Sequence, residues 1–240
     1  MFLAARDRLA ADTVLLDGPE GRHAATVRRL RPGDRADLAD GEGLLAECVV
    51  AAARPGALEL TVLRRHHVPP PEPRVCVVQA IAKGERAELA VETMTEVGVD
   101  TVVPWAAERC VAVWPAGERG ARALDRWRAT AREAAKQSRR ARIPEVTALA
   151  RTADVAARAA QAACAVILAP DAPVRLGALP LPGTGEILVV VGPEGGVSPA
   201  ERAAFEAAGA VAARLGPTVL RTSTAGAVAA TVLLSRTPRW

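Results

Sequence analysis

The sequence predicts an α/β protein in two parts, a small β-rich domain followed by a larger domain in which strands alternate with helices. Four prolines stand within five residues at 69–73, and short apolar runs separated by turn residues precede them. Longer apolar strands and amphipathic helices follow them. The chain has 240 residues, of which 50% are hydrophobic and 24% charged. This composition suits a globular protein and excludes a disordered or fibrous chain.

The first domain is predicted over residues 1–68. Its apolar runs end at turn signals such as Asp17-Gly18-Pro19, Asp40-Gly41 and Arg54-Pro55-Gly56. The predicted strands are 13–16, 35–38, 44–51 and 58–63, and a helical turn is expected at 23–30. Short strands at this spacing are typical of a small β-barrel or sandwich.

The prolines at 69–73 predict a linker, because proline fixes φ and removes a backbone donor. The second domain is therefore predicted over residues 74–240. Its strands are expected at 75–80, 101–104, 165–169, 187–191 and 212–215, and a final buried helix is expected at 223–234. Strands that alternate with helices favour a mostly parallel sheet.

Two further helices are predicted from their periodicity. The first turns Ala87, Ala90, Val91, Met94 and Val97 to one face, and Glu85, Glu88, Glu92 and Glu96 to the other. This carboxylate stripe is interpreted as a solvated helix face rather than a metal site. The second helix turns Leu124, Trp127, Ala131, Ala134, Ala135 and Ser138 toward the core. It leaves Arg122, Arg126, Arg132, Lys136 and Arg140 to face solvent or phosphate.

Positive charge is concentrated in one stretch of the chain. The formal net charge is only +4, but residues 119–142 hold nine basic and two acidic residues. A cluster of this kind permits an anionic partner such as nucleic acid.

Several classes of protein are disfavoured. No apolar run approaches the roughly 18 residues of a membrane span, and the N-terminus lacks a signal-peptide pattern. We therefore expect a cytoplasmic protein with no membrane association. The four cysteines are widely spaced, without a CxxC motif, so we expect buried thiols rather than disulfides or a metal site.

Two glycine-containing turns carry the strongest chemical signal. The strand at 187–191 runs into Gly192-Pro193-Glu194-Gly195-Gly196, and Ser198-Pro199-Ala200-Glu201 then has the pattern of a capped helix start. A second turn, Leu215-Gly216-Pro217, leads to the last helix. Two such turns at strand ends can converge on one ligand pocket. Neither is a GxGxxG fingerprint, which disfavours a Rossmann enzyme.

Arg221 lies between apolar Leu220 and the predicted buried helix, where a cation needs an anionic partner or a developing negative charge. A salt bridge with a neighbouring carboxylate is the alternative interpretation.

The segments GPEGGVSPAE and LGPTVLRTSTA together resemble the C-terminal motifs of the bacterial 16S ribosomal RNA uridine-N3 methyltransferases, the RsmE family of the SPOUT superfamily. The resemblance extends through HAATVRRLRPGDRADLADGEG, AKGERAELAVETMTEVGVDTVVPWAAERC and REAAKQSRRARIPEV, and so covers nearly the whole chain.

The resemblance implies an N-terminal PUA-like β-barrel, a C-terminal α/β domain with a trefoil knot, a homodimer and S-adenosylmethionine as cofactor. The substrate it implies is 16S rRNA within the small ribosomal subunit, and no metal is required. The residues expected to bind the cofactor are Leu168, Gly192, Glu194, Gly195, Leu215, Gly216, Leu220 and Thr222. Those expected to bind RNA are His23, Arg28, Arg29, Lys83, Arg139 and Arg140.

The chemistry of the reaction suggests roles for two residues. Uracil N3 is a poor nucleophile until its proton leaves and negative charge spreads onto the ring oxygens. Arg221 is expected to stabilise that charge through its planar fork of donors. Glu194 is expected to act as a base, or else to anchor the glycine turn. Two other classes stay open: a non-catalytic RNA-binding assembly factor, and a SPOUT enzyme that methylates a ribose 2′-hydroxyl.

Overall fold

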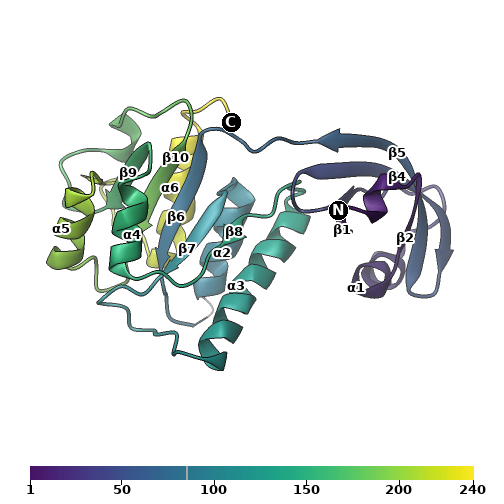
Figure 1. Ribbon diagram of the computed structural model, residues 1–240, viewed down its shortest axis with the longest axis horizontal. Helices are drawn as coiled ribbons and strands as arrows, with labels where there is room; N and C mark the ends of the chain where they lie inside the picture. The colour runs from purple at the N-terminus through teal and green to yellow at the C-terminus, as the bar shows by residue number, and fades with distance from the viewer. Residues whose placement is uncertain (85) are drawn as a thin grey trace. The chain divides into compact units, whose positions relative to one another are not determined.

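The computed structural model describes residues 1–84 and 86–240, and the chain divides into two compact units (Figure 1). Unit 1 comprises Met1–Pro70 and Ala135–Ile143. Unit 2 comprises Pro71–Ala134 and Pro144–Trp240. The stretch 135–143 joins unit 1 although it follows the predicted linker by more than sixty residues in sequence.

Unit 1 is built on a five-stranded sheet in the order β1-β3-β4-β5-β2. The strands are β1 Phe2–Leu3, β2 Thr13–Leu16, β3 Leu38–Ala39, β4 Leu44–Arg54 and β5 Ala57–His67. β1 runs parallel to β3, and the other neighbours are antiparallel. Alternation in β2 and β4 turns Val14, Leu16 and Cys48 into a core that also contains Leu38 and Leu60.

Three short helical segments complete the described part of unit 1. They are the 3-10 turn η1 Arg8–Ala10, the helix α1 Gly18–Arg22 and the π-helical turn η2 His23–Val27. The helical turn predicted at 23–30 begins where η2 begins but extends three residues beyond its end, and α1 before it was not predicted. The strand predicted at 35–38 is also wrong in extent, since Arg35 makes only an isolated bridge with Val49 and the ladder begins at Leu38.

Unit 2 is built on a six-stranded parallel sheet in the order β11-β9-β10-β6-β7-β8. The strands are β6 Arg74–Ala80, β7 Thr101–Trp105, β8 Glu145–Val146, β9 Cys164–Leu168, β10 Glu186–Val191 and β11 Val211–Ala213. The predicted parallel sheet is confirmed, and four of its five predicted strands end within a residue of the observed bounds. β8 has only two residues, too few for a periodicity signal.

Helices cover both faces of this sheet (Figure 1). They are α2 Arg86–Val97, α3 Glu118–Gln137, α4 Thr152–Ala159, α5 Pro199–Ala207 and α6 Thr222–Leu234, with the 3-10 turn η3 Leu176–Ala178. Cys76 and Val78 pack with residues of α4 and α5, including Val155 and Phe205. The opposite face carries α6, where a Cβ on Gly226 would lie 3.2 Å from Val77. Glycine at this position lets α6 approach the sheet closely.

The predicted inward face of α3 is confirmed at Trp127 and Ala131, which are buried. Lys136 was expected to face solvent or phosphate, and this prediction is wrong. Its side chain is 8% exposed, and its Nζ lies 2.8 Å from Glu20 Oε1. The helix ends where residues 135–143 join unit 1, so the polar face there is covered by protein instead of water.

Backbone bonds explain why residues 135–143 belong to unit 1. Ile143 N–H donates to the carbonyl oxygen of Gly41 at 2.9 Å, and Gly43 N–H donates to that of Ala141 at 3.0 Å. The side chain of Arg142 donates to the carbonyl oxygen of Val68 at 2.9 Å. The partners in these three bonds are between 74 and 102 positions apart in sequence, beyond the reach of local patterns.

The carboxylate stripe of α2 forms a solvated face where it is described. Glu92 and Glu96 are exposed, and Glu88 pairs with Arg126 at 3.4 Å. Glu85 lies outside the described residues. Across the described chain, no group of three or more His, Cys, Asp or Glu side chains is arranged to hold a metal ion.

The four cysteines have free thiols, of which Cys48 and Cys76 are buried and Cys110 and Cys164 half-buried. Burial raises the pKa of each of these thiols. Within residues 1–84 and 86–240, the helices are too short or too polar to cross a membrane.

Candidate active site

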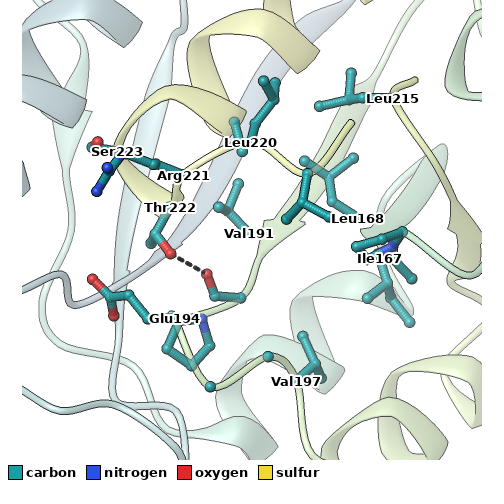
Figure 2. Close-up of a pocket in the computed structure, with 18 of the residues that line it drawn as sticks. Ile167, Leu168, Val191, Glu194, Val197, Leu215, Leu220, Arg221, Thr222 and Ser223 are labelled. Carbon is teal, nitrogen blue, oxygen red and sulfur yellow. Dashed lines mark hydrogen bonds between the residues drawn. The ribbon is translucent and has the colours of Figure 1, made fainter. Parts of the chain in front are cut away.

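A cavity of about 580 Å³ lies at the carboxyl ends of strands β9 and β10 (Figure 2). Two loops border it, and we call them loop A, residues 192–197, and loop B, residues 215–221. Loop A leaves β10, and loop B connects β11 to α6. The carboxyl ends of parallel strands meet at one edge of a sheet, which is where ligands of open α/β folds bind.

Loop A turns sharply and then starts α5. Gly196 has φ 73°, a left-handed conformation that favours glycine, and its N–H donates to the carbonyl oxygen of Pro193 at 2.8 Å. Ser198 Oγ accepts a bond from Glu201 N–H, while Ser198 N–H donates to Glu201 Oε2 at 2.9 Å. The capping box predicted at Ser198 is therefore confirmed.

Loop B carries backbone donors that no described protein group uses. Within the part of the chain that the structure describes, the N–H groups of Leu215, Gly216, Thr218, Val219, Leu220 and Arg221 donate to no other protein group. All six residues line the cavity. Thr222 and Ser223, in the first turn of α6, line it as well. A helix N-terminus and free N–H groups together favour the polar and anionic parts of a ligand.

One side-chain bond joins loop A to the start of α6. The hydroxyl of buried Thr222 donates to the carbonyl oxygen of Gly192 at 3.1 Å (Figure 2). Gln79, buried on β6, supports the same turn, because its Nε2 donates to the carbonyl oxygen of Thr222 at 3.2 Å. Gln79 Oε1 has no partner among the described residues. The start of α6 is thus attached to both central strands.

The cavity has an apolar side and a charged side. Figure 2 shows Ile167, Leu168 and Leu215 on one side, with the charged ends of Arg221 and Glu194 on the other. Both charged side chains are exposed, and neither bonds a group in the described residues. The salt bridge considered for Arg221 is therefore not formed within that part of the chain, nor does Glu194 anchor loop A there.

The structure brings the predicted cofactor residues together. Leu168, Gly192, Glu194, Gly195, Leu215, Gly216, Leu220 and Thr222 all line this cavity, as does Arg221. Their roles stay predictions. A volume of about 580 Å³ lies within the range of small-molecule sites. An apolar side, six free N–H groups and a helix N-terminus suit the adenine and methionyl parts of S-adenosylmethionine, so the residues present fit this cofactor.

Sequence reasoning missed several residues of the site. Asp171 and Arg202 form an ion pair of 3.1 Å at the cavity wall. Arg109, from the loop after β7, donates through Nη1 to the carbonyl oxygen of Gly195 at 3.2 Å. The glycine turns could be predicted because each is a contiguous sequence motif. No sequence motif indicates that Arg109 lies beside Gly195 in the fold.

The predicted RNA-binding residues fall in both units. Lys83 is an exposed residue of unit 2, whereas His23, Arg28, Arg29, Arg139 and Arg140 belong to unit 1. His23 is half-buried and packs edge-on against Phe2 with ring centroids 6.0 Å apart. Arg28, Arg29 and Arg139 are exposed.

Arg28 and Arg139 lie near one point of unit 1. The pKa of the Met1 amino group is lowered by burial first, and the charges of Arg139, Arg28 and Lys136 lower it further. Arg29 and Arg139 also have positive φ values of 53° and 56°, which are uncommon outside glycine. Strained backbone of this kind concentrates at functional sites.

Comparison with known proteins matches both units. Residues 70–234 match the model of an RNA methyltransferase domain, and residues 16–63 match an RNA methyltransferase PUA domain. The structure also resembles the crystal structure of a ribosomal RNA small subunit methyltransferase E from Neisseria gonorrhoeae bound to S-adenosyl methionine. That likeness has a TM-score of 0.84 at 26% identity and covers 98% of this chain and 96% of the other. The fold and the cavity thus define an RNA methyltransferase with an α/β domain and a PUA domain.

Relatives in sequence specify the family. The chain is 51% identical over 230 residues to the ribosomal RNA small subunit methyltransferase E of Mycobacterium bovis, covering 94% of this chain and 87% of the relative. It is 27% identical to the protein of the same name from Bacillus subtilis, covering 90% of this chain and 87% of that relative. The chain belongs to the ribosomal RNA small subunit methyltransferase E family.

Proposed function

We propose that this protein transfers a methyl group from S-adenosylmethionine to N3 of a uracil in 16S ribosomal RNA, and acts in the cytoplasm. The observation that carries the proposal is the cavity that loops A and B border, where the bond from Thr222 to Gly192 joins loop A to the start of α6. Family membership and the likeness to a cofactor-bound relative support it.

The cofactor supplies a methyl group that its sulfonium already activates. Leu168, Leu215 and Leu220 offer apolar surface to the adenine, and loop B offers backbone donors to polar groups. Gly192 and Gly195 keep side chains out of the way where loop A borders the cavity. The protein contributes position, because two reactants held in line react as if at very high concentration.

Arg221 is placed to stabilise the charge that develops on the uracil. Its guanidinium extends at the charged side of the cavity and has donors to spare, since no described residue bonds it. A guanidinium group stays positively charged while its planar set of N–H groups donates to a carbonyl oxygen. Glu194 extends on the same side, where an exposed carboxylate can accept the N3 proton directly or through water.

The RNA is held mainly through its phosphates in this proposal. His23, Arg28, Arg29, Lys83, Arg139 and Arg140 supply the contacts, which give affinity without reading sequence. Residues 1–68 serve as a PUA-like β-barrel that grips RNA, and residues 74–240 serve as the catalytic domain, with 69–73 as the linker. The match of residues 16–63 to a PUA domain supports this division.

Two features of the assembly are also proposed from family membership. The catalytic domain carries the trefoil knot of the SPOUT superfamily, and the protein works as a homodimer on the small ribosomal subunit. Val228 on α6 is 39% exposed beside small alanines, which offers a closely packable surface. Light scattering at micromolar concentration tests the dimer, and a species of 25 kDa alone argues against it.

The test of function is nucleoside analysis by mass spectrometry of ribosomal RNA from cells that lack and then regain this chain. The proposal predicts that N3-methyluridine disappears from 16S rRNA and returns. Methylation of a ribose in its place indicates the related 2′-hydroxyl chemistry. Unchanged RNA, with no cofactor binding by the purified protein, indicates a non-catalytic assembly factor.

A further inference from the structure

Behind loop A lies one buried carboxylate, that of Glu201 on α5. The residue is only 4% exposed. Its Oε2 accepts a bond from the N–H of Ser198, the residue directly after loop A, at 2.9 Å. Its Oε1 accepts one from Glu108 N–H at 2.7 Å and one from the Thr152 hydroxyl at 3.3 Å. One side chain therefore joins loop A, the loop after β7 and the start of α4.

This arrangement reaches the cavity through Arg109, the neighbour of Glu108. Arg109 Nη1 donates to the carbonyl oxygen of Gly195 at 3.2 Å. A Cβ built on Gly195 would lie 3.0 Å from Arg109 Cβ, so the two residues are in close contact. The position of the loop after β7 consequently limits where the middle of loop A can lie.

Both carboxylate oxygens of Glu201 accept hydrogen bonds, and one of the donors, Thr152, is itself held by a neighbouring side chain. Thr152 Oγ1 accepts a bond from the indole N–H of Trp105 at 3.4 Å while it donates to Glu201. Trp105 in turn packs edge-on against Phe205 of α5, with ring centroids 5.3 Å apart. Because three donors converge on one carboxylate, an amide in its place would direct at least one N–H toward a donor.

We propose that Glu201 is a positioning residue for methyl transfer, which fixes loop A at the cavity through Ser198 and, by way of Glu108, through Arg109. The inference rests on the proposed function, because it gives a role to a residue behind the same cavity. A helix cap alone needs only the bonds between Glu201 and Ser198. Capping does not require the bonds from Glu108 and Thr152 to Glu201. Nor does it require the contact between Arg109 and Gly195.

The experiment compares Glu201→Gln with Asp154→Asn. Asp154 is a matched control because its carboxylate caps α4 by accepting a bond from Arg151 N–H at 2.8 Å, yet it does not line the cavity. S-adenosylmethionine affinity is measured by calorimetry, and methyl transfer by single-turnover assays with saturating cofactor, at a temperature where both variants are folded. We expect Glu201→Gln to lose about 10- to 100-fold in cofactor affinity or transfer rate. Asp154→Asn should stay within about twofold of the parent on the same measures.

A double-mutant cycle separates positioning from capping. If Glu201 acts through Arg109, then Arg109→Ala should weaken cofactor binding in the parent but add little to Glu201→Gln. Equal losses in both backgrounds, or parental affinity and parental transfer rate in Glu201→Gln despite a lower melting temperature, would overturn the proposal. Should Glu201→Gln not fold, Arg109→Ala and Gly195→Ala carry the test, and parental affinity with parental transfer rate in both variants overturns the proposal. A parent protein that neither binds cofactor nor methylates RNA refutes the proposed function itself.

Discussion

The hydroxyl of Thr222 donates a hydrogen bond to the carbonyl oxygen of Gly192, thirty residues earlier in the chain, at 3.1 Å. Thr222 begins α6 and Gly192 begins loop A, so this bond joins the two segments that border the cavity. Both loops are otherwise short turns with little regular backbone bonding. The shape of the cavity therefore depends on a contact that no local pattern specifies.

The first prediction concerns this bond. Thr222→Val removes the hydroxyl at nearly constant volume, and the lost bond should cost about 1 kcal/mol of cofactor binding, roughly fivefold in affinity. Calorimetry with S-adenosylmethionine measures the change. Thr231→Val is the control, because the Thr231 hydroxyl bonds Ala227 within the same helix and lies away from the cavity. An equal loss in the two variants contradicts the assignment.

The second prediction concerns Arg221. Arg221→Lys should keep cofactor affinity but lose about 10²–10³-fold in transfer rate, because lysine keeps the charge without the planar fork. Single-turnover assays with saturating cofactor isolate this step. Glu194→Gln is the companion variant: a base should lose rate with an altered pH profile, whereas a loop anchor should mainly lose cofactor affinity. Parental rates in Arg221→Lys remove Arg221 from the mechanism.

The third prediction concerns RNA affinity. If about five phosphates are contacted, the logarithm of the association constant should fall with the logarithm of salt at a slope of about −3.5 to −4.5. Reversal of charge at Arg139 and Arg140 should weaken binding and flatten the slope, with cofactor binding unaffected. The matched control reverses Arg54 and Arg236, two exposed arginines outside the predicted contacts. A salt-independent affinity for the parent argues against phosphate contacts.

The fourth prediction concerns the ion pair of Lys136 and Glu20, whose side chains are 8% and 16% exposed. Lys136→Met leaves the Glu20 carboxylate without its cation, and should lower the free energy of unfolding by about 1–3 kcal/mol. Urea unfolding followed by circular dichroism measures this. Adding Glu20→Gln should recover part of the loss, since the uncompensated charge is then gone. Full stability in Lys136→Met shows that the pair contributes nothing.

The fifth prediction concerns pH. Burial, and secondarily the charge of Asp37, raises the pKa of the Cys48 thiol from 9.0 to about 11. The fold favours the neutral thiol. The contribution of this thiol to the free energy of unfolding is therefore complete below pH 9, and it is lost as the pH rises toward 11. The loss should reach about 2–3 kcal/mol. The Cys48→Ala variant should be less stable than the parent at pH 8, but its free energy of unfolding should fall less than the parent's between pH 8 and 10.5. Urea unfolding at both pH values measures this. Equal falls in the two proteins contradict the prediction.

Local sequence determined the parts of this protein whose signal is contiguous. β2 and β10 lie where alternation and a continuous apolar run predict them, and Ser198 caps α5 as its motif predicts. The two glycine turns were found for the same reason. Periods of 2 and 3.6 residues, caps and turns all act over a few neighbouring residues, which makes them readable without a structure.

The tertiary structure decided what depends on residues far apart in the chain. The helical pattern in the sequence identifies the polar and apolar faces of α3. It does not show that Lys136, on the polar face, is buried against Glu20, 116 residues away in the chain. In the same way, Arg109 meets Gly195 only because strands β7 and β10 belong to one parallel sheet, whose carboxyl ends bring their following loops to the same edge. Strand order is set by packing of the whole chain, so the sequence determined which loops this protein has, and the fold determined which of them meet.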